Sequence, residues 1–361
     1  MKKIFSLIAM CLVSLSMKAQ SSLVATLTHD GTTTEYYGVN ALADAVTSSA
    51  DGDLITLSPG VFHGTTIDKN LIIRGAGIGN AEADDENATR IDTKVVLKRS
   101  AGEGEPFINI EGINFLNYLN LYKGAYDELD IVENVVIKKC DINYFDSEVW
   151  EKQYKGYLYG TSKNFTFIQC RIKSRAFMDN ISQVSYINCL VFEPCFRHEY
   201  SMQSIQPDVN FLNSVVFLRN NACYHFSSNS QNCVIVVNCD WAHEYSFPAG
   251  VITKNCIITG SLDDPNQSNR VIASGDATNN VWMDLRDTFS NFTTANYDYQ
   301  PTIDYSLTSE AQSFKGTDDT QVGFYGGAAP YSSVVTYPHF TTFNVAEKSV
   351  DGKISVDIAV E

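Results

Sequence analysis

The decapeptide Glu133-Asn-Val-Val-Ile-Lys-Lys-Cys-Asp-Ile142 sets a pattern that returns four more times without gaps. The other copies occupy residues 163–172, 182–191, 207–216 and 232–241. Each has two apolar residues in alternation, then Asn, Gln or Lys, then Cys or Ser, and another apolar residue two positions on. A period of 20 to 50 residues is the mark of stacked repeat units, and we call each copy a rung.

Apolar residues at every second position, such as Val135 and Ile137, are typical of β-strands that bury one face. The polar residue interrupts this alternation at one fixed place, which predicts a bend between two strands. The residues after the bend recur at intervals of 17 to 30 positions, so the loops vary while the strands do not. We therefore expect an all-β solenoid in which each rung is stable only beside its neighbours.

The bend predicts two stacks of side chains along the solenoid. The polar bend residues are expected to hydrogen-bond to one another as an amide ladder, namely Gln169, Asn188, Asn213, Asn238 and Asn255. The residue after each bend is expected to join an interior column. Its members are Tyr118 after Asn117, Cys140 after Lys139, and then Cys170, Cys189, Ser214, Cys239 and Cys256. A buried thiol behaves as a small apolar residue, so most cysteines are predicted to be unpaired.

Both ends of the chain resemble a known family. Residues 40–46, 52–62 and 70–77 resemble the entrance of pectate-lyase-like proteins, the right-handed parallel β-helices of the pectin lyase fold. The resemblance implies a short capping helix at 38–49 and opening strands from Leu54 to Leu57 and from Leu71 to Ile73. Residues 305–331 look like the closing rung of secreted β-helix proteins common in gut Bacteroidetes. No specific enzyme family is matched.

The ends of the chain also predict processing and domain limits. Lys2 and Lys3, the apolar run 4–15 and Ala19 indicate a signal peptide over 1–19. Met10 before Cys11 argues against a lipoprotein, and the product is expected to be secreted, periplasmic or on the cell surface. A β-helix domain over 20–331 and an extension over 332–361 would follow. In that extension, strands 342–350 and 353–360 predict a hairpin that packs against the solenoid or pairs with another chain.

The composition restricts the partners. A formal net charge of −16 argues against nucleic acid, which is bound through Lys and Arg. No run after the signal is long enough to span a membrane as a helix. Basic residues follow the column in successive rungs, namely Arg171, Lys173, Arg175, Arg197 and Arg219. They form either a basic track for uronates or a solvated face paired with acids such as Asp141, Asp146, Asp179 and Glu193.

Two functions follow from these residues. Trp150, Tyr154 and Tyr157 lie in the insertion 143–160 and either stack on sugar rings or cover the flank of the coil. With Arg171, Arg197 and Arg219 they would bind or organise polysaccharide without catalysis, and no cofactor is expected. The alternative is a lyase for acidic glycans with Lys173 or Arg175 as base, where Ca²⁺ would assist. The segment Cys170-Arg-Ile-Lys173 contains the Arg-Ile-Lys string known from polygalacturonases, but their other motifs are absent. Whether the chain is an enzyme, and its oligomeric state, stay open.

Overall fold

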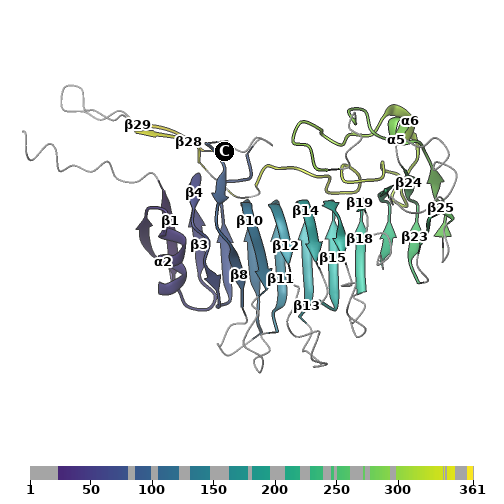
Figure 1. Ribbon diagram of the computed structural model, residues 1–361. Coiled ribbons are helices and arrows are strands. Elements are labelled where there is room, and N and C mark those ends of the chain that lie inside the picture. Colours follow the sequence, from purple (N-terminus) through teal and green to yellow (C-terminus); the bar gives the residue numbers. More distant parts are fainter. Residues whose placement is uncertain are drawn as a thin grey trace, which may run out of the picture.

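The protein is all-β and consists mainly of two long, mostly parallel sheets (Figure 1). The computed structural model describes residues 23–79, 86–98, 105–121, 131–146, 162–177, 181–195, 208–219, 228–238, 245–247, 250–260, 271–272, 277–292, 298–335, 337, 340–345 and 356–360. The predicted signal peptide lies outside these residues. Within the described ranges, no helix is long and apolar enough to cross a membrane.

Among the described residues, the first sheet has twelve strands, and its only antiparallel pairs join β1 to β2 and to β3. In spatial order its strands are β2 (Thr32–Tyr37), β1 (Val24–His29), β3 (Leu54–Leu57), β6 (Leu71–Arg74), β9 (Ile108–Glu111), β11 (Glu133–Lys138), β13 (Lys163–Ile168), β15 (Gln183–Ile187), β18 (Asp208–Leu212), β20 (Asn229–Gln231), β23 (Ile252–Lys254) and β26 (Ala277–Thr278). The opening strands predicted at Leu54 and Leu71 are thus both in this sheet.

In the part of the chain that the structure describes, the second sheet has thirteen strands and all of its pairs are parallel. Its main order is β27 (Val281–Trp282), β24 (Ile257–Thr259), β21 (Val234–Asn238), β19 (Val215–Arg219), β16 (Leu190–Phe192), β14 (Arg171–Phe177), β12 (Asp141–Asp146), β10 (Asn114–Leu121), β7 (Thr89–Ile91) and β4 (Gly60–Phe62), with β5 (Thr66–Ile67), β8 (Val95–Leu97) and β17 (Pro194–Cys195) beside this path. Between β9 and β16 the chain visits the two sheets alternately, which is compatible with a β-helix.

Each bend from the first sheet to the second contains a residue in the left-handed backbone region. Its φ lies between 46° and 72° at Gly112, Lys139, Gln169, Asn188, Asn213, Asn232 and Asn255. Glycine and asparagine tolerate this conformation best, which explains why they recur here. The predicted alignment was therefore wrong in two rungs: the bend is at Gly112 and not Asn117, and at Asn232 and not Asn238.

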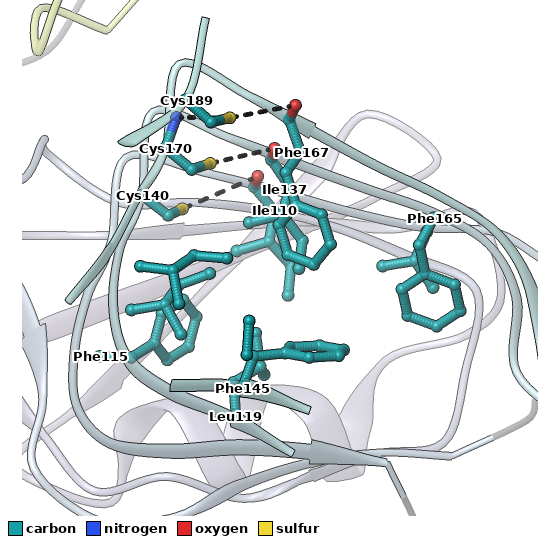
Figure 2. Close-up of a cluster of buried hydrophobic side chains, with 14 of the residues drawn as sticks. Ile110, Phe115, Leu119, Ile137, Cys140, Phe145, Phe165, Phe167, Cys170 and Cys189 are labelled. Atoms are coloured by element: carbon teal, nitrogen blue, oxygen red, sulfur yellow. Dashed lines mark hydrogen bonds between the residues drawn. The ribbon is translucent and has the colours of Figure 1, made fainter. Parts of the chain in front are cut away.

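The residue after each bend points into the core. Cys140, Cys170, Cys189, Cys233 and Cys256 are all buried and free. Their thiols donate to backbone carbonyls of the preceding rung, as from Cys170 Sγ to Ile137 O and from Cys189 Sγ to Phe167 O, both 3.3 Å (Figure 2). Cys233 takes the place predicted for Cys239, which lies outside the described residues. Tyr118 was wrongly placed in this column, because its side chain lies on the surface.

Large side chains fill the rest of the interior in register. The rings of Phe167, Tyr186 and Phe211 belong to three successive strands and stack with centroids 4.9 and 4.8 Å apart. Phe145 meets Phe167 edge to face at 5.3 Å (Figure 2). The parallel registers Phe167↔Tyr186 and Tyr186↔Phe211 set this spacing. Stacking therefore couples each rung to the next through the core.

A second apolar cluster lies on the outside of the second sheet. Outward residues of β16, β19, β21 and β24 are apolar, and runs such as Val215–Leu218 are buried on both faces. They are covered by residues 285–292 and 298–314, which we call the cover. The cover contains two short helices, α5 (Leu285–Thr288) and α6 (Ser309–Ser313). A continuous apolar run is the sequence signal for burial on both faces.

After the cover, residues 315–335 run back along the bends, and we call them the return segment (Figure 1). Asn255 donates to Lys315 O, Asn188 to Gly326 O and Gln169 to Pro330 O. The return segment therefore meets the later bends first and runs opposite to the order of the bends in the chain. The expected closing rung over 305–331 is wrong, because these residues add no strand to either long sheet. The expected amide ladder is also wrong, because these bend amides bind the return segment instead.

Two further elements lie outside the long parallel pairing. The helix α2 (Ala41–Ser48) packs against β1, β2 and β3. The ammonium of Lys69 donates to three backbone carbonyls at the carboxyl end of this helix, those of Val46, Thr47 and Ser49, at 2.6 to 3.0 Å. At the other terminus, β28 (Phe340–Val345) pairs antiparallel with β29 (Val356–Val360) in a separate sheet. The turn of the predicted hairpin, between residues 350 and 353, lies outside the described residues.

Candidate functional site

A groove of about 870 Å³ lies on the outer face of the second sheet, beside the cover. Five strands provide its floor, namely β10, β12, β14, β16 and β19, and Asp298, Tyr299 and Pro301 of the cover line it as well. Outward residues of β10, β12 and β14 include Asn114, Asn143 and Lys173, where later strands carry apolar residues. The cover buries the apolar outer faces of β16, β19, β21 and β24, so its edge lies beside the polar outer faces of β10, β12 and β14.

A row of side chains crosses the groove at one register position per strand. Tyr118 of β10 pairs with Tyr144 of β12, which pairs with Arg175 of β14. The two tyrosine rings stack with centroids 4.7 Å apart and an interplanar angle of 20°. Tyr118 is 41% exposed. The stacked pair is therefore an accessible aromatic platform at one end of the groove.

Asp141 joins two cations at the floor. Its carboxylate accepts two hydrogen bonds from Arg171, from Nε at 2.6 Å and from Nη2 at 2.7 Å. Its Oδ2 also accepts from Lys173 Nζ at 3.3 Å, and that ammonium donates to Asn114 Oδ1 at 3.3 Å. The Asp141 side chain is only 3% exposed, so it is a buried counterion for both cations.

Arg171 lies behind the groove and does not line it. Its guanidinium is 6.0 Å from the ring centroid of Tyr299 and 5.9 Å from that of Tyr331. Burial lowers its pKa, but Asp141, Tyr331 and Tyr299 together raise it by more, and the net pKa is above the ordinary value. Arg171 therefore fixes the cover and the return segment to β14, which is a structural role.

Glu193 stands at a kink between β16 and β17. Its φ is 43°, a left-handed value that is costly for a glutamate. Its carboxylate accepts a hydrogen bond from Arg175 Nε at 3.2 Å and lies 3.4 Å from Arg219 Nε. Arg219 is also paired with Asp298 of the cover. The kink thus turns a carboxylate toward two arginines in the groove.

The structure brings together three of the basic residues proposed from the sequence, Lys173, Arg175 and Arg219. Each of the three, like Arg171, is in contact with a carboxylate. The other proposed site residues lie outside the described residues, namely Arg197, Trp150, Tyr154 and Tyr157.

Sequence reasoning missed two parts of the groove. Tyr118 was assigned to the interior because Asn117 was aligned with the asparagines of the other bends. Aligning Gly112 with those bends would have placed Tyr118 on the outside. Asp298 and Tyr299 belong to no repeat, so no periodic signal could place them beside β14. A run such as Leu190-Val-Phe192 could have indicated that another segment covers that face.

The chemistry of the groove is that of ion pairs, hydrogen bonds and stacking. Both lining carboxylates, Glu193 and Asp298, contact Arg219. Among the described residues, no three His, Cys, Asp or Glu side chains are arranged to hold a metal ion. No protein-family model matches the chain, and no curated protein matches it either. The fold class is therefore defined by the two long parallel sheets, and functional inference rests on the groove alone.

Proposed function

We propose that this protein is a secreted right-handed parallel β-helix that binds polysaccharide in the groove without cleaving it. The observation that carries the proposal is the stacked pair Tyr118 and Tyr144 in the same groove as Lys173, Arg175 and Arg219. Aromatic faces pack against the apolar faces of sugar rings, and Lys and Arg bind carboxylate or sulfate groups. The combination suits a glycan that carries acidic groups.

The dimensions of the groove agree with a chain-like ligand. Its floor crosses five strands of one parallel sheet. Neighbouring strands are about 4.8 Å apart, so the floor extends about 19 Å along the stack. The strand spacing is comparable with the length of one sugar unit in an extended glycan. A bound oligosaccharide can therefore meet one side chain of the row Tyr118, Tyr144 and Arg175 per unit.

Local charge favours an acidic ligand despite the formal net charge of −16. Three cations line the groove, Lys173, Arg175 and Arg219, against the two carboxylates of Glu193 and Asp298. The lining therefore carries an excess of one positive charge. Such a local excess attracts an anionic segment, and high salt should weaken the attraction.

The lyase alternative needs Lys173 or Arg175 to take a proton from the sugar. Lys173 is held by Asp141 and Asn114, and Arg175 contacts Glu193. Both side chains are therefore engaged by groups of the protein, and each would have to leave its partner to reach a proton of the sugar. Binding without elimination is thus the better explanation of this groove.

The finer features of the fold belong to the same proposal. Alternation of the chain between two sheets, with a bend of constant conformation, supports the right-handed solenoid. The helix α2 packs on the strands at one end and would cap the first rung. Residues 1–19 would direct export and be cleaved near Ala19.

A glycan array followed by an elimination assay tests the proposal. The purified protein is expected to bind acidic glycans such as pectate, alginate or chondroitin. Incubation with the same glycans, with and without Ca²⁺, should give no unsaturated product at roughly 235 nm. Absence of all array binding would refute the binding proposal, and a rising absorbance would establish the lyase.

A further inference from the structure

The two acidic residues of the groove are held in different ways. Glu193 belongs to the floor, is 17% exposed and contacts both Arg175 and Arg219. Asp298 belongs to the cover, is 58% exposed and is paired with Arg219. Arg219 is itself 35% exposed. Glu193 is therefore part of the built floor, whereas the pair of Asp298 with Arg219 is open to solvent.

An exposed ion pair is easily exchanged. Such a pair changes an equilibrium constant by at most about fivefold. The guanidinium of Arg219 can accept another carboxylate or a sulfate in the same fork geometry. Asp298 is paired with Arg219. An anionic group that contacts Arg175 as well as Arg219 gains an additional charged contact, so it can displace Asp298.

We propose that Asp298 is a built-in competitor for an anion subsite at Arg219, which a carboxylate or sulfate group of the glycan occupies on binding. The inference rests on the proposed glycan-binding function. Tyr118 and Tyr144 lie at the opposite end of the same groove and carry no charge. The groove therefore selects a glycan with a sugar ring at the tyrosines and an acidic group two or more strands away.

The variant Asp298→Asn tests this competition by isothermal titration. Three ligands of equal length are compared, namely an oligogalacturonate, a sulfated oligosaccharide and a neutral oligosaccharide. The variant should bind the acidic ligands about two- to fivefold more tightly and the neutral one unchanged. The two acidic ligands distinguish a carboxylate from a sulfate preference. Asp319→Asn is the matched control, since it removes the same charge from an exposed turn of the return segment outside the groove.

A double-mutant cycle shows whether the effect passes through Arg219. Arg219→Gln should weaken acidic binding, and Asp298→Asn should have no effect in that background. Arg219→Met, which also removes the charge, replaces the Gln variant if that one does not fold. The competitor proposal is overturned if Asp298→Asn behaves like Asp319→Asn, or tightens neutral and acidic ligands equally. Retained glycan binding in that case would leave the proposed function standing, whereas no binding by the wild type refutes both.

Discussion

The side-chain amide of Asn188 donates a hydrogen bond of 2.7 Å to the backbone carbonyl of Gly326. The same amide donates to Phe324 O at 3.1 Å. Asn188 also has a φ of 50°, so one residue forms the bend and anchors the return segment. The recurrence of asparagine at the bends thus has two causes, backbone conformation and tertiary hydrogen bonding.

Substitution of Asn188 should separate these two causes. Asn188→Ala loses both hydrogen bonds and places alanine in the left-handed region, so it should lower the free energy of unfolding by about 2–4 kcal/mol. Asn188→Gly loses the amide but keeps the backbone conformation, so its loss should be smaller. Urea unfolding measures both. Equal losses for the two variants would mean that backbone conformation contributes nothing.

Asp141 should be essential for stability. Asp141→Asn removes the charge that Arg171 and Lys173 share at a buried position, and breaking a buried ion pair typically costs about 3–5 kcal/mol. Thermal unfolding should therefore shift to a clearly lower temperature. Asp319→Asn, at an exposed turn, should leave the midpoint unchanged. An unchanged midpoint for Asp141→Asn would show that the ion pairs do not hold the cover and the return segment.

The cysteine column should resist thiol reagents in the folded protein. Burial raises the pKa of Cys140 to about 12, so at pH 8 only about one thiol in ten thousand would be ionised. Burial also raises the pKa of Cys170 and Cys233. Mass spectrometry after iodoacetamide treatment should find these sites unmodified in the native state and modified in urea. Modification of Cys140 in native protein would contradict its place in the core.

Stability should depend on His29 near neutral pH. Its Nδ1 is 2.7 Å from Asp53 Oδ1, and this hydrogen bond raises the pKa of His29 above 6.5. The stabilisation is therefore complete below pH 6.5 and is lost as pH rises through the raised value. His29→Gln should remove this part of the pH dependence. Denaturation curves between pH 5 and pH 9 test it, and identical profiles for both proteins would refute the linkage.

The repeat made the all-β class and the buried thiols predictable, because period-two alternation and a recurring cysteine reflect local geometry. The position of each bend within its rung was harder to predict. The choice of Asn232-Cys233 or Asn238-Cys239 as the bend depends on which asparagine has a positive φ. The two dipeptides have the same sequence, so the pattern does not distinguish them. The groove was predictable only in part, since Lys173, Arg175 and Arg219 follow the repeat. Asp298 and Tyr299 reach it through long-range packing of a non-repeating segment, which no local pattern encodes.

The most direct test of the proposed function is a titration of acidic oligosaccharide into the Tyr118→Ala variant. Loss of the aromatic platform should weaken binding about fivefold or more. Tyr37→Ala is the matched control, because Tyr37 is 43% exposed and belongs to β2, remote from the groove. We predict that only Tyr118→Ala weakens binding. Equal affinities for the wild type and both variants would contradict the assignment of the groove as the glycan site.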